Sequence, residues 1–531
     1  MIEGTDRNLL IQIEEGLWPV DRRGGPGKPH SGGLRLELES IRSSLFEGYT
    51  RRGFDEMFDE ADRPRPHYAR LYDRLVAMGG EELSRRHRLS DLILRHQGIT
   101  FTVYGRDQGV ERIIPFDPIP RLVTASEWEK IERGLKQRLR ALNAFVHDVY
   151  HDRKILRDRV IPPDLVLGAS GYRRECLGVR VAHDIYIHIC GIDLIRDETG
   201  EYLVLEDNGR TPSGVSYVLK NRQVMKQVFP VLFETYAIRP VDDYPADLLA
   251  TLRFAAPPSC GDDPCVAVLT PGLYNSAYFE HGYLARRMGV ELVEGRDLFF
   301  DRGQIFMRTT RGPRRVDVLY RRIDDDYLDP LVFRPDSQLG VPGLFAAYRG
   351  RQLGLANAIG TGVADDKAIY PYVPAMIRYY LGEEPILRNV ETFRPLIPSE
   401  RAYILAHLEQ LVVKAVDASG GYGMLIGPVS TRTQREEFAR RIEANPRGYI
   451  AQPTICLSQH PTLIDDRIEG RHVDLRPFVL CGREIKVLPG GLTRVALPRG
   501  SLVVNSSQGG GTKDTWVLAE LQDELRESGG G

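Results

Sequence analysis

The chain of 531 residues has few cysteines, almost no net charge and no long apolar run. Its six cysteines are scattered outside CxxC pairs, which argues against a zinc site and favours reduced thiols. A balance of 71 basic and 73 acidic residues argues against whole-chain attraction to nucleic acid or to an anionic membrane. Without a run able to span a bilayer, and with acidic residues among the first twenty, we expect a cytoplasmic protein.

At this length, with 42% hydrophobic residues, several domains are expected. A helix is predicted from Ser126, because Ser126 and Glu129 have capping-box spacing. Residues 255–264 are typical of a linker, and the strand–helix–strand order after them predicts an α/β domain. The predicted parts are a helical or irregular region 1–100, a metal-binding part 101–254, an α/β domain 265–360, a lysine and Gly-loop part 361–516, and a tail 517–531.

A predicted hairpin carries three oxygen-bearing side chains. Its strands span 185–195 and 201–208, joined by the turn RDETG. Glu206 and Asn208 share one face of the second strand, because side chains alternate along a strand, and Asp207 lies on the other face. With Asp193 opposite them, the three would suit Mg²⁺ bridging the phosphates of ATP, although a polar hairpin tip facing water is the alternative.

The segment GRTPSG, at 209–214, directly follows this hairpin and strengthens the first interpretation. Arg210 supplies a positive charge, and Thr211 and Ser213 supply hydroxyl groups. A glycine-flanked loop with exposed backbone amides can hold an anion.

Two lysines point to the same chemistry. Lys414 lies in the predicted strand 411–416, where an inward lysine needs an anionic partner. The glycine-rich turn after it could approach phosphate closely or be an ordinary hairpin, and it lacks the P-loop pattern. Lys367, predicted at the start of a helix, opposes the helix dipole and needs an anion nearby, which could simply be Asp365 or Asp366.

Two arginines near the C-terminus complete the candidates. Arg476 lies in the apolar strand HVDLRPFVL, and Arg494 follows the Gly-Gly turn of PGGLTRVA. Each could bind a carboxylate or phosphate through two N–H groups, or form a structural salt bridge. The segment RRIDDDYLDP, at 321–330, is predicted at a strand end, where it is either part of a substrate site or a solvated loop.

Together these segments resemble a known family. LEDNGRTPSG, DKAIYPYVP and VVKAVDASGGYG resemble glutathionylspermidine synthetase and its relatives, which are circularly permuted ATP-grasp ligases. In this chain the lysine segments follow the carboxylates, whereas in ordinary ATP-grasp enzymes they precede them. This reversed order is the circular permutation. RVAHDIYIHICGIDLIRD, RPFVL, PGGLTRVA and NSSQGGGTKDTW resemble more closely the circularly permuted ATP-grasp type 2 proteins, over roughly residues 100–516. The implied fold is α/β with α+β segments, a circularly permuted ATP-grasp with an inserted pre-ATP-grasp-like α/β domain.

The resemblance implies a ligase that forms a C–N bond through an acyl phosphate, with ADP and phosphate as products. It also implies roles for individual residues. Mg²⁺ would be bound by Asp193, Glu206 and Asn208. ATP would be bound by Lys367, Lys414, Ser419, Gly420, Gly421, Tyr422 and Gly423, with Gln452 beside the adenine. The reacting groups would be contacted by Arg210, Thr211, Ser213, Arg476 and Arg494.

One departure from the synthetase concerns the metal aspartate. The synthetase has an arginine just before it, whereas this chain has CGID, so we expect Arg210, Arg476 or Arg494 to meet the γ-phosphate. The missing arginine also keeps open an inactive nucleotide-binding scaffold, and an ATP-dependent phosphotransferase is a further alternative. The implied substrates are a small-molecule or peptide carboxylate and an amine acceptor, and family association implies a transglutaminase-like or helical partner protein.

Overall fold

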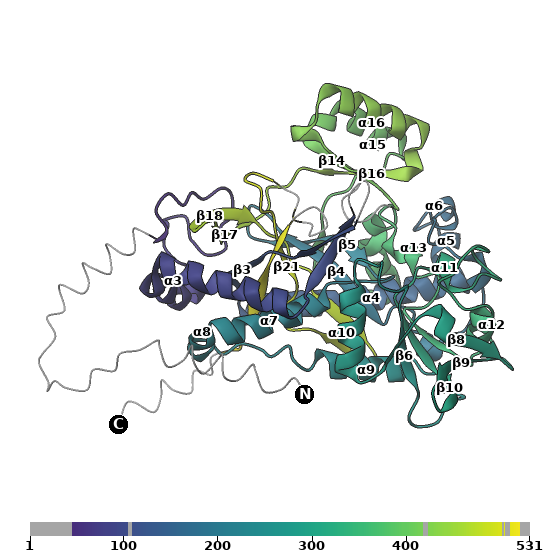
Figure 1. The fold of residues 1–531 in the computed structure, drawn as a ribbon. Helices are drawn as coiled ribbons and strands as arrows, with labels where there is room; N and C mark the ends of the chain where they lie inside the picture. The colour runs from purple at the N-terminus through teal and green to yellow at the C-terminus, as the bar shows by residue number, and fades with distance from the viewer. Residues whose placement is uncertain (1–44, 105–108, 418–422, 502–503, 505–509, 521–531) are drawn as a thin grey trace, which may run out of the picture. The chain divides into compact units, whose positions relative to one another are not determined.

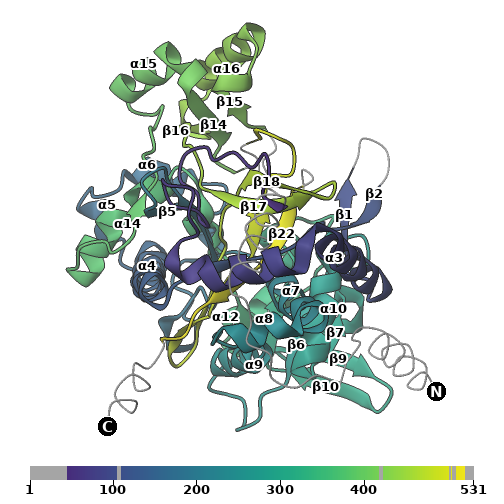
Figure 2. The same ribbon diagram turned by 90° about the vertical axis from the view of Figure 1, so that its left-hand side faces the viewer.

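The computed structural model describes residues 45–104, 109–417, 423–501, 504 and 510–520, which form a mixed α/β structure (Figures 1 and 2). No described helix is both long and apolar enough to cross a bilayer. The α-helices are α3 (Ala69–His96), α4 (Ala125–Tyr150), α5 (Lys154–Arg157), α6 (Pro163–Leu167), α7 (Val215–Val228), α8 (Pro230–Thr235), α9 (Tyr244–Phe254), α10 (Tyr278–Met288), α11 (Asp325–Leu328), α12 (Leu344–Arg349), α13 (Gly362–Asp365), α14 (Val373–Met376), α15 (Pro398–Ala406) and α16 (Arg432–Ala444).

A five-stranded sheet carries the predicted hairpin. Its order is β13 (Arg388–Asn389), β5 (Tyr202–Asn208), β4 (Ile189–Arg196), β19 (Phe478–Cys481) and β20 (Ile485–Val487), with only the β13–β5 pair parallel. The hairpin β4–β5 is confirmed, and its register places Asp193 opposite Glu206. The alternation is also as predicted, because Asp207 is buried whereas Glu206 and Asn208 are partly exposed.

Helix α4 packs its buried side chains, among them Trp128 and Leu135, into the same core as Ile192 and Leu194 of β4. The predicted N-cap was wrong by two residues. Thr124 and Glu127 form the capping box, with the Glu127 N–H donating to Thr124 Oγ1 over 3.3 Å. The same spacing occurs twice here. Strand β3 (Phe116–Val123) ends directly before Thr124, so the helix begins at the earlier of the two pairs.

A three-stranded antiparallel sheet contains the predicted strand of Lys414. Its order is β15 (Leu425–Ile426), β14 (Leu411–Ala415) and β16 (Tyr449–Pro453), so the strand expected at 411–416 is confirmed. Helices α15 and α16 cover one face of it (Figure 1), where Ile404 and Ile442 pack against Val413. The sheet has its own small core, separate from that of α4.

A parallel sheet follows the predicted linker. Its order is β12 (Gly354–Ala356), β11 (Val318–Arg321), β6 (Val266–Leu269) and β7 (Glu291–Val293), with α10 between β6 and β7 as expected. The sequence VDVLYRRI, at 316–323, also has the apolar pattern of a single strand, but it is divided: Val316 ends β10 (Gly312–Val316), and the Asp317 N–H donates to Cys265 O. The helical segment after the hairpin is likewise divided into α7 and α8, since Pro230 has no N–H to continue α7.

The remaining strands form small antiparallel or mixed sheets. They are β1 (Thr100–Tyr104) with β2 (Gly109–Ile113); β10 (Gly312–Val316), β9 (Gln304–Thr309) and β8 (Leu298–Asp301); β17 (Gln459–Ile464) with β18 (Arg467–His472); and β21 (Thr493–Val495), β22 (Gly511–Val517) and β3 (Phe116–Val123).

Candidate functional site

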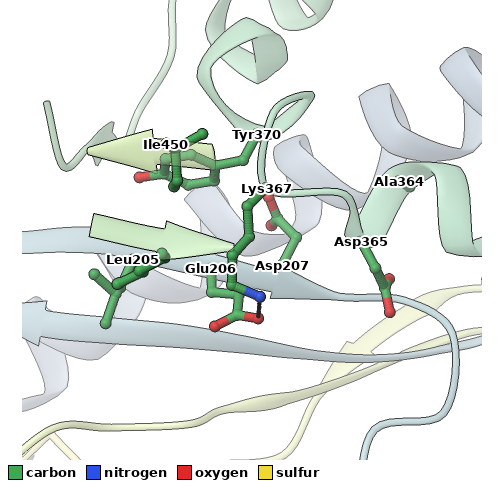
Figure 3. Close-up of a pocket in the computed structure, with 9 residues that line it drawn as sticks. Leu205, Glu206, Asp207, Ala364, Asp365, Lys367, Tyr370 and Ile450 are labelled. Carbon is green, nitrogen blue, oxygen red and sulfur yellow. Dashed lines mark hydrogen bonds and ion pairs between the residues drawn. The ribbon is translucent and has the colours of Figure 1, made fainter. Parts of the chain in front are cut away.

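A pocket lies between strand β5 on one side and strands β14 and β16 on the other (Figure 3). It brings together side chains from segments more than 200 residues apart in the chain. The lining residues are Leu205, Glu206, Asp207, Ala364, Asp365, Lys367, Tyr370, Lys414 and Ile450.

Lys367 spans this pocket towards β5. Its Nζ lies 2.8 Å from Glu206 Oε1, and both side chains are largely buried. This ion pair is drawn as a dashed line in Figure 3. The predicted helix start at Lys367 was wrong: the residue lies in a turn after α13, where Asp366 Oδ1 accepts the Ala368 N–H. The anion that faces Lys367 is therefore Glu206 from the distant hairpin, while Asp366 pairs with Arg447.

Lys414 approaches the pocket from β14. Its Nζ donates to Gln452 Oε1 over 2.8 Å, and the Gln452 amide donates in turn to Thr392 Oγ1. Burial lowers the pKa of Lys414 to about 8, although the Glu206 carboxylate opposes this shift. Of the predicted glycine-rich turn, Gly423 is described, with φ of 68°, whereas Ser419, Gly420, Gly421 and Tyr422 lie outside the described residues.

Asp193 is held by both predicted arginines. Arg476 donates to its two oxygens over 2.5 and 2.8 Å, and Arg494 Nη2 lies 2.7 Å from Oδ2. Burial would raise the pKa of Asp193, but the two guanidinium groups hold it well below its usual range. Arg494 is also paired with the fully buried Asp474, a partner that the sequence analysis missed although it lies two residues before Arg476 in the same apolar segment.

Arg210 is less constrained than these two arginines. Its guanidinium lies 3.5 Å from Asp324 and 3.9 Å from Asp365, and its side chain is 37% exposed. Within the described part of the chain, Arg210 Nε and Asn208 Nδ2 are buried N–H groups without a hydrogen-bond acceptor. An anion bound next to the hairpin end would supply the acceptor that both groups lack.

The segment 209–214, here called the β5–α7 loop, connects the hairpin to helix α7. Its first two amides donate to Asp365, from Gly209 over 2.5 Å and from Arg210 over 3.2 Å. Burial raises the pKa of Asp365 to about 7, although Arg210 opposes the shift. Thr211 and Ser213 are partly exposed, and the Ser213 carbonyl accepts a bond from Arg476 over 3.3 Å.

The predicted metal ligands converge on one end of the hairpin. Glu206 and Asn208 lie on the same face of β5, and Asp193 faces Glu206 across the pair. Carboxylate and amide oxygens fit a hard divalent cation. At present both carboxylates are neutralised by protein cations, Glu206 by Lys367 and Asp193 by the two arginines.

Comparison with known proteins identifies a family that matches most of this chain. Residues 120–496 match the family described as circularly permuted ATP-grasp type 2. The chain is 56% identical to the uncharacterized protein sll0335 of Synechocystis sp. over 466 residues, covering 88% of this chain and 97% of that one. It is 51% identical to the uncharacterized protein Rv2411c of Mycobacterium tuberculosis, covering 90% of this chain and 86% of that one.

Two further similarities carry functional names. The chain is 44% identical to a putative glutamate–cysteine ligase 2-2 of Frankia casuarinae, over 90% of its own length but only 55% of that protein. The fold resembles that of a glutathione synthetase-like effector, GSS30, from Globodera pallida, solved in the apo form, with a TM-score of 0.53 and 11% identity. That match covers 82% of this chain and 96% of the effector.

Proposed function

The chain belongs to the circularly permuted ATP-grasp type 2 family, and from this premise we propose that it is an ATP- and Mg²⁺-dependent ligase. The reaction we propose joins a carboxylate to an amine through an acyl phosphate, with ADP and phosphate released. The observation that carries the proposal is the meeting of Lys367, Lys414 and Glu206 in one pocket between two sheets. The name of the Frankia relative supports a C–N ligase, although this chain matches only 55% of that protein.

The chemistry of the pocket suits phosphoryl transfer, which depends on positioning and charge neutralisation more than on covalent help from the protein. Lys367 and Lys414 would neutralise ATP phosphates, and Lys367 would exchange its present partner Glu206 for them. A bound Mg²⁺, held by Glu206 and Asn208 with Asp193 beside them, would neutralise further phosphate charge. Each of these side chains is already directed to the pocket or to the adjoining hairpin end.

Arg210 is the arginine that we assign to the transferred phosphate. Its ion pairs are long, and its Nε lacks an acceptor among the described residues, whereas Arg476 and Arg494 are bonded to Asp193. Arg476 and Arg494 then act by orienting Asp193. The hydroxyl groups of Thr211 and Ser213, on the same loop as Arg210, would donate to the acyl group or the phosphate.

The proposal is tested by incubating the protein with ATP, Mg²⁺ and an extract of small carboxylates, amines and peptides. We expect phosphate release together with a product whose mass is the sum of two reactants less water, detected by mass spectrometry. Lys414→Ala and Glu206→Ala should abolish both, whereas Lys486→Ala, which removes an exposed lysine of β20, should not.

Three results would contradict parts of the proposal. Normal turnover in both site variants would remove the assignment of the pocket. A stable phosphorylated product that forms without an amine would indicate a phosphotransferase. ATP binding without phosphate release from any extract would indicate a nucleotide-binding scaffold.

A further inference from the structure

The β5–α7 loop is held from outside by three buried residues of the segment 265–360. Asn357 Nδ2 donates to the carbonyl of Gly209 over 2.8 Å and to that of Arg210 over 3.3 Å. Arg322 Nη1 donates to the Pro212 carbonyl over 2.6 Å. Glu280 Oε2 accepts the Gly214 N–H over 2.8 Å. Four backbone groups of the loop are therefore bonded by side chains that belong to another sheet and its helix.

Glu280 and Arg322 form a charged pair, and their carboxylate and guanidinium groups lie 3.2 Å apart. Glu280, from α10, is 1% exposed and also accepts bonds from the Ser216 N–H and hydroxyl, at the N-terminal end of α7. A carboxylate is favourable at that end of a helix because the helix dipole is positive there. Removing one member of such a pair leaves the other buried without its counter-charge.

The position of these residues in the parallel sheet explains how they reach the loop. Arg322 directly follows β11, and Asn357 directly follows β12, so both lie at the carboxyl edge of neighbouring strands. Asn357 also accepts the His188 and Ile189 N–H groups at the start of β4, over 2.7 and 2.8 Å. One side chain thus connects the beginning of the hairpin to the loop that leaves it.

The loop itself has little freedom to adopt another conformation. Gly214 has φ of 114°, and a Cβ atom there would lie 2.9 Å from Leu492 Cδ2. Side chains of the protein donate to four carbonyl groups of the loop, those of Gly209, Arg210, Pro212 and Ser213. The partly exposed groups of the loop include the side chains of Arg210, Thr211 and Ser213.

We propose that Glu280, Arg322 and Asn357 are positioning residues for the nucleotide. They lie outside the pocket, yet they set the geometry in which the β5–α7 loop meets the phosphates of ATP. This inference rests on the proposed function. It makes the parallel sheet part of the nucleotide site, because its carboxyl edge holds the loop in place.

The test uses the full-length protein, with a non-hydrolysable ATP analogue and Mg²⁺ as the probe. Titration calorimetry gives its affinity, thermal unfolding gives stability, and hydrogen exchange gives the opening of residues 206–216 without nucleotide. Arg322→Lys and Glu280→Gln should each weaken binding by about tenfold or more and accelerate exchange in that segment. Asn357→Asp, which keeps the shape but replaces the donating amide, should do the same.

The matched control is Arg222→Lys, which alters another buried ion pair, between Arg222 of α7 and Asp514 at 2.8 Å. It should lower the melting temperature without changing affinity or exchange at 206–216. If Arg322→Lys and Glu280→Gln both bind with wild-type affinity, the positioning role is overturned but the proposed function is not. The same holds if the control Arg222→Lys loses as much affinity as these two variants. Absence of binding by the wild-type protein would overturn the proposed function as well. If Glu280→Gln does not fold, Arg322→Lys and Asn357→Asp decide the matter by the same measurements.

Discussion

Removing the positive charge of Lys414 is expected to weaken ATP binding, and two independent perturbations can remove it. The first is substitution by methionine, which keeps the length of the side chain but eliminates the ammonium group. A hydrogen bond to a charged group contributes about 1.5–3 kcal/mol, so Lys414→Met should raise the dissociation constant about 10- to 150-fold.

The second perturbation is pH. Burial lowers the pKa of Lys414 to about 8, below its ordinary value, so the lysine is charged below that pH and loses its proton above it. The protonated fraction should fall from about three quarters at pH 7.5 to about a tenth at pH 9. Binding that requires the charged form should therefore weaken about eightfold over this interval, because ATP must then restore the proton.

The assay is calorimetric titration with a non-hydrolysable ATP analogue and Mg²⁺ between pH 7.5 and 9, where the phosphates are already ionised. Lys486→Met serves as the control, since that lysine is 54% exposed and lies on β20. The wild type and this control should lose affinity with pH, whereas Lys414→Met should bind weakly and without the pH dependence. A flat profile for the wild type, or the same slope in Lys414→Met, would refute the reasoning.

Three further predictions follow from the contacts. Arg138→Met breaks the buried pair with Asp207, whose N–O distances are 2.6 Å, and should cost about 3–5 kcal/mol of unfolding free energy in urea titrations; a loss below about 1 kcal/mol would contradict it. Thr124→Ala should cost about 1 kcal/mol by the same method, whereas Ser126→Ala should cost almost nothing, and equal losses would restore the later cap. Arg210→Met should reduce phosphate release while changing the free energy of unfolding by less than about 1 kcal/mol. Arg494→Met should lower the free energy of unfolding by about 3–5 kcal/mol, because Asp193 and Asp474 stay buried without this counter-charge. A large loss of stability in Arg210→Met would show that Arg210 has a structural role.

The residues of the hairpin show which part of the candidate site was predictable from the sequence. Strand alternation has a period of two, so Glu206 and Asn208 had to share one face and Asp207 the other. The pairing of Asp193 with Glu206 was not predictable from the turn RDETG, because it depends on a register shift between Asp193 and Leu194, after which Leu194 pairs with Val204. The strand of Lys414 and the helix and strand that follow residue 265 were predictable, because each is a local pattern of apolar residues.

Contacts across the chain could not be predicted in this way. The sequence offered Lys367 two neighbouring aspartates, but its carboxylate partner is Glu206, 161 residues earlier. It offered three arginines for one role, and the structure separates them by their partners, since two are bonded to Asp193 and Arg210 is not. Charge and residue type alone cannot make that distinction, because an ion pair depends on distance and burial in the folded chain.

Sequence by itself thus determined the family motifs, their permuted order, the hairpin strands and the strand of Lys414, because covalent spacing and side-chain periodicity are local properties. Tertiary structure decided which cation faces which carboxylate and which capping box closes α4. It also decided that Glu280, Arg322 and Asn357 hold the β5–α7 loop. The sequence marked the segment of Arg322 as a candidate but assigned no role to Glu280 or Asn357. Only the packing of the parallel sheet against the hairpin gives the three residues their contacts, since hydrogen bonds require donors and acceptors to meet in space.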